Sequence, residues 1–449
     1  MKRPICDFVK EYTESATVRA HMPGHKGKGD IERYDITEIA GADSLFDAEG
    51  IIRESEEYAS GLFGAKTFYS TEGSSHTIRA MLYLVSLYAK KQGKEPRILA
   101  ARNAHKALLS ALIMLDIEVE WIFPNVEDSY LSMKVCPEDL DMILSVTEEK
   151  PTAVYITSPD YLGAVSDIAG LSAVCREHGV LLIIDNAHGA YLRFLPENAH
   201  PITLGADMCC DSAHKTLPVL TGGAYLHINR EADPIFTDTA RHALALFGST
   251  SPSYIVLQSL DAVNGYLDGN YRAELAGFLP KAEALKTKLA ERGYSLFGDE
   301  PMKITIKASE YGYSGDELAD ILRERDIECE FSDRDHLVLM LTPQNTDGEL
   351  EIIEKALLSI EKKDTKAAEG LITPTFCLPM YEMSPREAAL SPSEMLPLDE
   401  CIGRVCALAT VGCPPAVPIV VSGEVIDETA AETLRYYGVT ECLVVKKSK

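Results

Sequence analysis

The fold of this chain is decided by Asp211-Ser212-Ala213-His214-Lys215-Thr216-Leu217-Pro218, a stretch that follows an apolar run at 206–210. An earlier segment, Asp185-Asn186-Ala187-His188, follows the apolar run 180–184, and its aspartate precedes the lysine by thirty positions (215 − 185). Strands of a parallel sheet end at a common edge, where ligands bind. We therefore predict that Asp185 and Lys215 lie at the same edge of a mainly parallel sheet.

A carboxylate and a lysine in this arrangement are what a pyridoxal phosphate (PLP) enzyme requires. The lysine holds the cofactor aldehyde as a Schiff base, and the carboxylate keeps the pyridine nitrogen protonated, so that the ring accepts electrons from a bond broken at the substrate Cα. Lys215 has apolar neighbours on both sides, and partial burial makes a lysine amine more nucleophilic. The alternatives are a solvated surface lysine and an aspartate that only caps a turn.

Charge and composition narrow the class of partner. The chain has 449 residues, 43 basic and 69 acidic, which gives a formal net charge of −26. This charge argues against nucleic acid or an anionic membrane as partner. It would favour a cationic substrate, although an acidic surface that simply keeps a protein soluble is the commoner explanation. A chain of this length is expected to divide into two or three domains.

The cysteines and the N-terminus indicate a cytoplasmic protein. Eleven cysteines are scattered without a Cys-x-x-Cys pair, a pattern typical of reduced thiols, and their spacing gives no support for a metal site. The first seven residues lack the apolar core of a signal peptide, and no apolar run is long enough to span a membrane.

Helix and strand patterns alternate over about 46–230, which predicts an α/β domain with a doubly covered, mainly parallel sheet. Apolar residues at helical spacing predict a helix over Ser74–Lys91. The other elements predicted here are strands at Arg97–Ala101, Ile117–Ile122 and Thr152–Thr157 and a helix at Ser166–Glu177.

The second half of the chain shows a different order of elements. After a helical connector near 253–295, a β-α-β-β-α order predicts a small α+β domain. Its predicted elements are Met302–Ala308, Ser314–Asp326, Ile327–Phe331, His336–Thr342 and Asp347–Lys362. A lysine-rich tract at 362–366 is predicted to be a linker. The tail has a capping box at Ser384–Glu387 and a predicted strand at Ile419–Ser422. The predicted division is 1–45 for an N-terminal segment, 46–262 for the PLP-binding domain, 263–367 for the small domain and 368–449 for a C-terminal α+β domain.

A phosphate site is predicted where Gly73, Ser74 and Ser75 begin a long helix. Backbone N–H groups, hydroxyls and the helix dipole at such a start attract phosphate. A Gly-Ser-Ser sequence also serves as an ordinary helix cap, so the prediction depends on the cofactor inferred above. Ser212 and His214, which flank Lys215, are further phosphate candidates, unless they only shape the loop.

Two histidines are candidates for the site. His105 begins the helix after the strand at 97–101, where its flat ring could stack on the pyridine; a helix cap or a core histidine is the alternative. His188 lies three positions after Asp185 and could approach the cofactor's phenolic oxygen or the substrate carboxylate. Ala187, which lies between Asp185 and His188, is counted with the cofactor-binding residues.

Taken together, these segments resemble the Orn/Lys/Arg decarboxylase family of fold-type-I, aspartate aminotransferase-like PLP enzymes, in the short form without an N-terminal wing domain. The resemblance covers nearly the whole chain. It rests on the segments 21–27, 35–43, 62–65, the Gly73 turn, 103–106, 185–189, 212–215, 249–254, 314–318, 383–388 and 414–418. One departure is Gly222, in a segment where many relatives have glutamine.

The resemblance implies a role for each site residue. Lys215 would carry the cofactor, Asp185 would pair with the pyridinium, and His105 would stack on the ring. Ser74, Ser75, Ser212 and His214 would serve the phosphate. Family members work at least as homodimers with active sites at the interface, so Ser249 or Thr250 would reach the partner subunit's phosphate.

The expected reaction is decarboxylation of arginine, lysine or ornithine to agmatine, cadaverine or putrescine, amines of polyamine biosynthesis. An aminotransferase or β-eliminating lyase would use the same lysine and aspartate, and a non-catalytic regulator could keep the fold. Asp43 and Glu424 are weak candidates for reading the substrate side chain, because a turn carboxylate is the commoner explanation for each. The sequence does not indicate which basic amino acid is used.

Overall fold

The computed structural model describes residues 2–123, 130–363, 380–409 and 417–447. The chain divides into two compact units. The first comprises 1–98, 137–158 and 167–274, and the second comprises 99–136, 159–166 and 275–449. This division differs from the four segments expected from the sequence, whose boundaries remain a prediction. The predicted linker at 362–366 lies largely outside the described residues.

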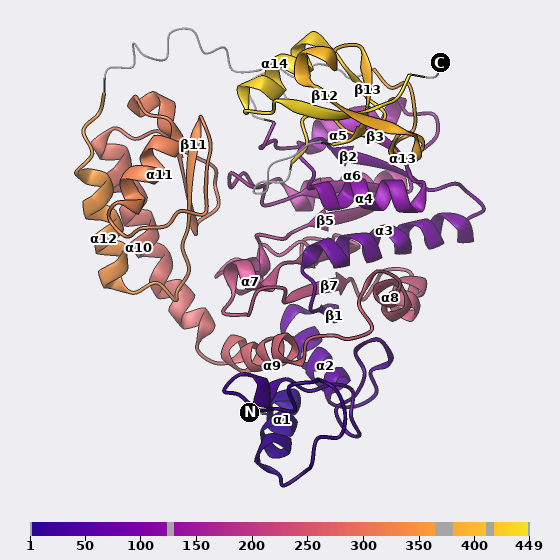
Figure 1. Ribbon diagram of the computed structural model, residues 1–449, viewed down its shortest axis with the longest axis vertical. Helices are drawn as coiled ribbons and strands as arrows, with labels where there is room; N and C mark the ends of the chain where they lie inside the picture. The colour runs from indigo at the N-terminus through magenta and orange to yellow at the C-terminus, as the bar shows by residue number, and fades with distance from the viewer. Residues whose placement is uncertain (1, 124–129, 364–379, 410–416, 448–449) are drawn as a thin grey trace. The chain divides into compact units, whose positions relative to one another are not determined.

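The first unit holds most of the central sheet, whose full strand order is β1-β7-β6-β5-β4-β2-β3 (Figure 1). Pairing is parallel between β4 and β5 and between β5 and β6, and antiparallel where β7 meets β6 and β1. The predicted mainly parallel α/β sheet is thus confirmed. The strands are β1 (Lys66–Ser70), β2 (Arg97–Ala101), β3 (Glu118–Ile122), β4 (Ala153–Thr157), β5 (Leu181–Asp185), β6 (Met208–Asp211) and β7 (Ala224–Ile228).

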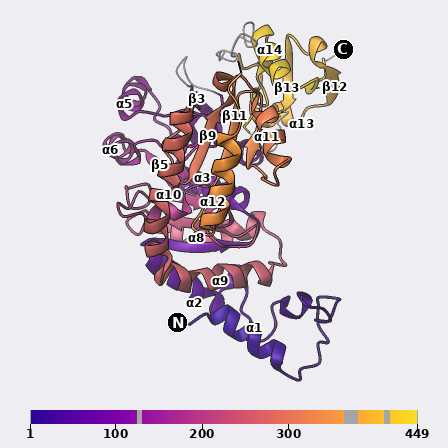
Figure 2. The ribbon, with the colours of Figure 1, turned by 90° about the vertical axis from the view of Figure 1, so that its left-hand side faces the viewer.

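Buried apolar residues explain why these strands form. All five residues of β5 are buried, as expected for a strand covered on both faces. The helices of the first unit are α1 (Pro4–Glu14), α2 (Ile51–Phe63), α3 (Ser74–Lys91), α5 (Pro137–Val146), α6 (Ile168–His178), α7 (Ala213–Thr216), α8 (Pro234–Phe247) and α9 (Tyr254–Asp268). Helices α1, α2 and α9 pack on one another, as Figures 1 and 2 both show.

The second unit contains two four-stranded sheets, ordered β10-β11-β9-β8 and β12-β15-β13-β14. Its strands after β3 are β8 (Leu296–Phe297), β9 (Lys303–Lys307), β10 (Phe331–Ser332), β11 (His336–Met340), β12 (Ser393–Pro397), β13 (Arg404–Leu408), β14 (Val425–Ile426) and β15 (Glu441–Val445). Its helices are α4 (Lys106–Leu115), α11 (Gly315–Arg323), α12 (Asp347–Leu358), α13 (Pro385–Leu390) and α14 (Glu428–Tyr436), and α10 (Tyr271–Arg292) crosses the division between the units. The predicted β-α-β-β-α order is present as β9-α11-β10-β11-α12.

Two predicted strands are wrong. The region Ile327–Phe331 is irregular except at Phe331, which begins the two-residue strand β10. Ile419–Ser422 is not a strand, because its backbone groups bond to side chains. The Ile419 carbonyl accepts from the Arg102 guanidinium at 2.9 Å, and the Val421 N–H donates to Glu424 Oε2 at 2.7 Å.

Among the described residues, no helix is both long and apolar enough to cross a membrane, and none of the nine described cysteines forms a disulfide.

Candidate active site

Asp185 is the last residue of β5 and has only 2% of its surface exposed. Its carboxylate accepts three bonds: the Tyr155 hydroxyl at 3.0 Å, the Ala187 N–H at 3.2 Å and the Cys210 thiol at 3.5 Å. Burial, followed by the charge of Asp185, raises the pKa of Tyr155 well above its ordinary value, so this phenol remains a donor. Asp185 therefore lies at the end of its strand, as the sequence predicted, and three donors hold its carboxylate in place.

Lys215 lies in the short helix α7, which begins directly after β6. Its side-chain nitrogen is 2.9 Å from His188 Nε2, and its N–H donates to the Ser212 carbonyl at 3.0 Å. His188 belongs to the turn that starts at Asp185. The structure thus brings Lys215 and His188 together at the same edge of the sheet at which β5 ends.

The predicted phosphate turn also adjoins the Lys215 segment. Gly73 has φ +75°, and a Cβ added there would meet no atom within 4 Å. The Ser212 hydroxyl donates to the Ser74 hydroxyl at 2.8 Å, so two predicted phosphate residues lie side by side. His214 Nδ1 donates to the Gly223 carbonyl at 3.0 Å, which fixes its ring against the neighbouring loop.

Gly222 belongs to that loop and has a structural reason to be glycine. Its φ is +97°, a conformation that other residues rarely adopt, and an added Cβ would lie 2.7 Å from the Thr71 carbonyl oxygen. The Gly73 N–H donates to the Gly222 carbonyl at 2.7 Å. The close approach of the two loops therefore excludes a side chain at 222 in this backbone arrangement.

The roles predicted for the site residues, including His105, Ser75, Ser249 and Thr250, remain untested predictions. His105 is the N-cap of α4, where its Nδ1 accepts from the Ala107 N–H at 3.1 Å. The capping alternative is thus observed, and stacking on a cofactor stays a prediction. Ser249 is exposed, and its N–H donates to Glu72 Oε1 at 2.7 Å; Thr250 is exposed as well. The position of Ser75, at the start of α3, agrees with the predicted turn.

The two candidates for reading the substrate side chain have structural tasks. Glu424 is not a surface turn residue: it is 1% exposed and bonds to Arg102 at 3.1 Å, the Tyr381 hydroxyl at 3.0 Å and the Val421 N–H. Asp43 accepts from backbone N–H groups at the start of α2, among them those of Gly50 and Ile52, each at 2.9 Å. Burial raises the pKa of Asp43, but these backbone bonds outweigh it and lower the pKa.

Two partners of Asp185, Tyr155 and Cys210, were not predicted from the sequence. Both lie on strands that flank β5, and the register pairs Asp185 with Cys210. The ends of the apolar strands do indicate which residues lie at this edge of the sheet. They do not indicate which of these residues form hydrogen bonds with one another.

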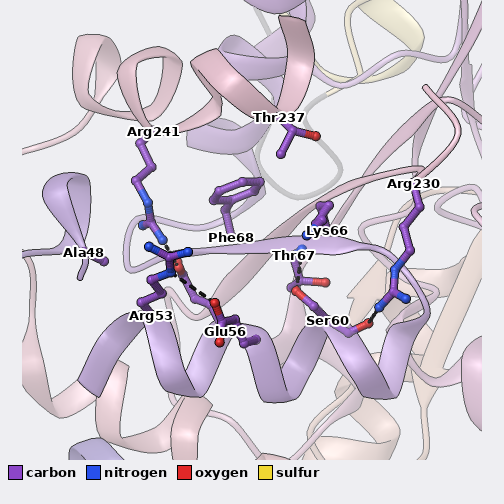
Figure 3. Close-up of a pocket in the computed structure, with 11 residues that line it drawn as sticks. Ala48, Arg53, Glu56, Ser60, Lys66, Thr67, Phe68, Arg230, Thr237 and Arg241 are labelled. Carbon is purple, nitrogen blue, oxygen red and sulfur yellow. Dashed lines mark hydrogen bonds and ion pairs between the residues drawn. The ribbon is translucent and has the colours of Figure 1, made fainter. Parts of the chain in front are cut away.

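A hollow of about 400 Å³ lies away from these residues, beside β1, α2 and α8 (Figure 3). It has four cationic side chains, three of which already have partners. Arg53 pairs with Glu57, Arg241 with Glu56, and Arg230 donates to the carbonyls of Ser60 and Ala65. None of the predicted site residues lines this hollow. Its lining residues are Ala48, Arg53, Glu56, Glu57, Ser60, Lys66, Thr67, Phe68, Arg230, Thr237 and Arg241.

The fold and the strand-end acid and lysine define an α/β protein of the fold-type-I, aspartate aminotransferase-like class. A structure described as SPT with PLP shares this fold, with a TM-score of 0.55 and 15% identity over 74% of this chain and 81% of that one. The structure of constitutive lysine decarboxylase from Escherichia coli is more similar, with a TM-score of 0.77 and 19% identity over 99% of this chain and 82% of that one.

Sequence comparison is more specific than the fold. The model of the Orn/Lys/Arg decarboxylase major domain matches residues 3–297, and that of the C-terminal domain of the same family matches 371–444. The chain belongs to the Orn/Lys/Arg decarboxylase family. Arginine decarboxylase from Bacillus subtilis strain 168 is 27% identical over 95% of this chain and 91% of its own length. The family predicted from the sequence is thus confirmed.

Proposed function

We propose that this protein is a PLP-dependent enzyme that decarboxylates a basic L-amino acid, releasing CO₂ and agmatine, cadaverine or putrescine. The observation that carries the proposal is the Lys215–His188 pair, 2.9 Å apart, at the strand edge where the buried Asp185 ends β5. Family membership supports the reaction, since the family is one of amino-acid decarboxylases.

The residues present fit the cofactor. Two hydroxyls, of Ser74 and Ser212, and the open space at Gly73 offer a cradle for a phosphate at the start of α3. The Thr216 hydroxyl, one residue after Lys215, is buried without a partner, although buried polar atoms in folded proteins are nearly always bonded. A phosphate in this region would give that hydroxyl an acceptor.

Each residue has a distinct task in the proposed reaction. Lys215 would hold PLP covalently through its side-chain nitrogen. Asp185 would hold a proton at the pyridine nitrogen, and its three donors keep its carboxylate in position. Bound PLP supplies an electron sink for the pair left at Cα when the carboxylate departs. Because Lys215 Nζ and His188 Nε2 are within hydrogen-bond distance, the pair can hold and deliver the proton that Cα then needs.

Residues outside this cluster complete the proposal. His105 would supply the flat ring above the cofactor. Ser249 and Thr250, both exposed, would act on the site of a partner subunit in a homodimer. Arginine is the first substrate to test, because several relatives that align over nearly the whole chain at 26–27% identity are named arginine decarboxylase.

The test is a substrate panel. Protein reconstituted with PLP is incubated separately with arginine, lysine and ornithine, and the products are identified by mass spectrometry. We expect one amine together with CO₂, and a loss on the order of 10³-fold or more for Lys215→Ala. Lys94→Ala, at an exposed lysine between α3 and β2, is the control and should retain full activity. A keto acid product, or equal activity of the two variants, would contradict the proposal.

A further inference from the structure

Asp211 ends β6, four positions before Lys215, and has no exposed surface. Its carboxylate accepts three side-chain bonds from three different segments. The Asn186 amide donates to Oδ1 at 2.6 Å, while His200 Nε2 and His227 Nε2 donate to Oδ2 at 3.1 and 3.2 Å. Such a carboxylate is held by charge-assisted bonds, which are about twice as strong as neutral ones.

His227 is itself fixed. The Thr67 hydroxyl is 2.9 Å from its Nδ1, so both ring nitrogens of His227 have partners. Burial lowers the pKa of His227. The Phe63 ring packs on His227 with a centroid distance of 4.5 Å. This donor to Asp211 thus comes from a rigid part of the core.

Asn186 connects this network to the candidate site. It directly follows Asp185, its N–H donates to the Cys210 carbonyl at 3.0 Å, and its carbonyl accepts from the Gly189 N–H at 2.8 Å. A Cβ at Gly189 would lie 2.0 Å from Asn186 Oδ1, so the turn leaves the Asn186 side chain little freedom. The Asn186–Asp211 bond therefore joins the turn that carries His188 to the segment that carries Lys215.

We propose that Asp211 and Asn186 are positioning residues, which hold the two strand-end segments so that Asp185, His188 and Lys215 face one cofactor. This inference rests on the proposed function. Neither residue needs to touch the cofactor: Asp211 acts through Asn186 and through the start of the Lys215 segment. The functional geometry at this edge of the sheet then depends on one buried anion.

A metal ion is the competing explanation for this cluster, since ligand atoms of His200, Cys209 and Asp211 all lie within 4.8 Å of one another. The hydrogen bonds argue against it, because each imidazole nitrogen facing Asp211 already carries a proton that the carboxylate accepts. The cluster is thus better explained as a hydrogen-bond network.

The test compares Asp211→Asn with Asp207→Asn. Asp207 is a half-buried carboxylate that precedes β6 and accepts the Leu182 N–H at 2.8 Å at the opposite end of the strand. Apoprotein is titrated with PLP, and the visible absorbance of the lysine-bound cofactor is followed against pH. For Asp211→Asn we expect PLP affinity to fall about 10-fold or more, as for other groups that orient a site, together with a displaced pH midpoint. Asp207→Asn should bind PLP as the wild type does.

A second variant and a cofactor-free measurement guard against loss of folding. Asn186→Ser replaces the side-chain amide by a shorter hydroxyl that cannot reach as far, and it should weaken PLP binding by a smaller factor. Hydrogen exchange of the apoprotein should show faster exchange at 185–189 and 211–216 in both variants. Unchanged PLP affinity and pH midpoint in folded variants would overturn the inference, as would stoichiometric zinc in purified protein.

These outcomes leave the proposed function standing, whereas wild-type protein that binds PLP but forms no amine would defeat the proposed function alone.

Discussion

Asp211 and Glu56 are two buried carboxylates of the same unit that differ in their electrostatics. Burial raises the pKa of either group. At Asp211 the two imidazoles outweigh burial and lower the pKa well below its usual range. At Glu56 burial prevails over the Arg241 guanidinium and raises the pKa to about 7. Both acids are buried, so the charge interactions and hydrogen bonds around each carboxylate, rather than its depth, decide whether it stays ionised.

The two acids also do different work. Glu56 faces the open side of β1, where its Oε1 accepts the Tyr69 N–H at 2.9 Å and Arg241 bonds to Oε2 at 2.5 Å (Figure 3). The Ser60 hydroxyl accepts the Thr67 N–H in the same way. Strand β1 is an edge strand, and covering its free N–H groups prevents pairing with another chain. Glu56 therefore closes a sheet edge, whereas Asp211 supports the candidate active site.

The largest expected effect comes from neutralising Asp211. Its depressed pKa means that the charged form stabilises the fold above the unfolded-state pKa, near 3.8, and that this contribution is lost as pH falls through the lower native-state pKa. Asp211→Asn should cost about 3 kcal/mol or more at pH 7, and the deficit should shrink in acid. Urea unfolding followed by circular dichroism at several pH values measures this. A deficit independent of pH would show that Asp211 is not held as an anion.

A somewhat smaller effect, of opposite sign with pH, is expected at Glu56. The native state holds a proton that the unfolded chain has lost between pH 4.5 and about 7, so stability should decline as pH rises through that window. The rise in the pKa of Glu56 corresponds to a contribution of about 3 kcal/mol at most to the free energy of unfolding. Glu56→Gln should abolish this part of the pH dependence. Glu57→Gln, at an exposed neighbour, is the control and should leave the pH profile unchanged.

The smallest effect on stability is expected at Ser60, whose hydroxyl accepts the other free N–H of β1. Ser60→Ala removes the acceptor of the Thr67 N–H and should lower stability by about 1 kcal/mol at every pH, since no titrating group is lost. Ser86→Ala on α3, whose hydroxyl donates to the Leu82 carbonyl of its own helix, is the matched control. A pH-dependent loss in Ser60→Ala would mean that the Glu56 contacts had changed as well.

The sequence predicted the parts of the molecule that depend on local pattern. Apolar runs ending at Asp185 and before Asp211 located the site edge, and helical spacing placed α3 at its observed bounds. The partners of Asp211 were not predictable, because His200 and His227 lie 11 and 16 positions away and meet it only through the folded sheet.

The wrong predictions have physical causes. Ile327 is buried, and the apolar residues near it indicate burial in the core rather than pairing with another strand. The Ile419–Ser422 segment has the composition of a strand, but Arg102, 317 positions from Ile419, takes its carbonyl. The burial of Glu424 is not evident from the sequence, because its buried partner Arg102 lies 322 positions away. Long-range side-chain contacts of this kind leave no local signal.

The contact between Gly222 and the Thr71 carbonyl constrains how this chain can change. Gly222→Gln would drive a side chain into a main-chain oxygen and would demand a backbone turn that glutamine disfavours. Any side chain at 222 therefore requires the loop at 71 to be reshaped before, or together with, residue 222. The single substitution should disrupt both loops unless they are exchanged as a pair.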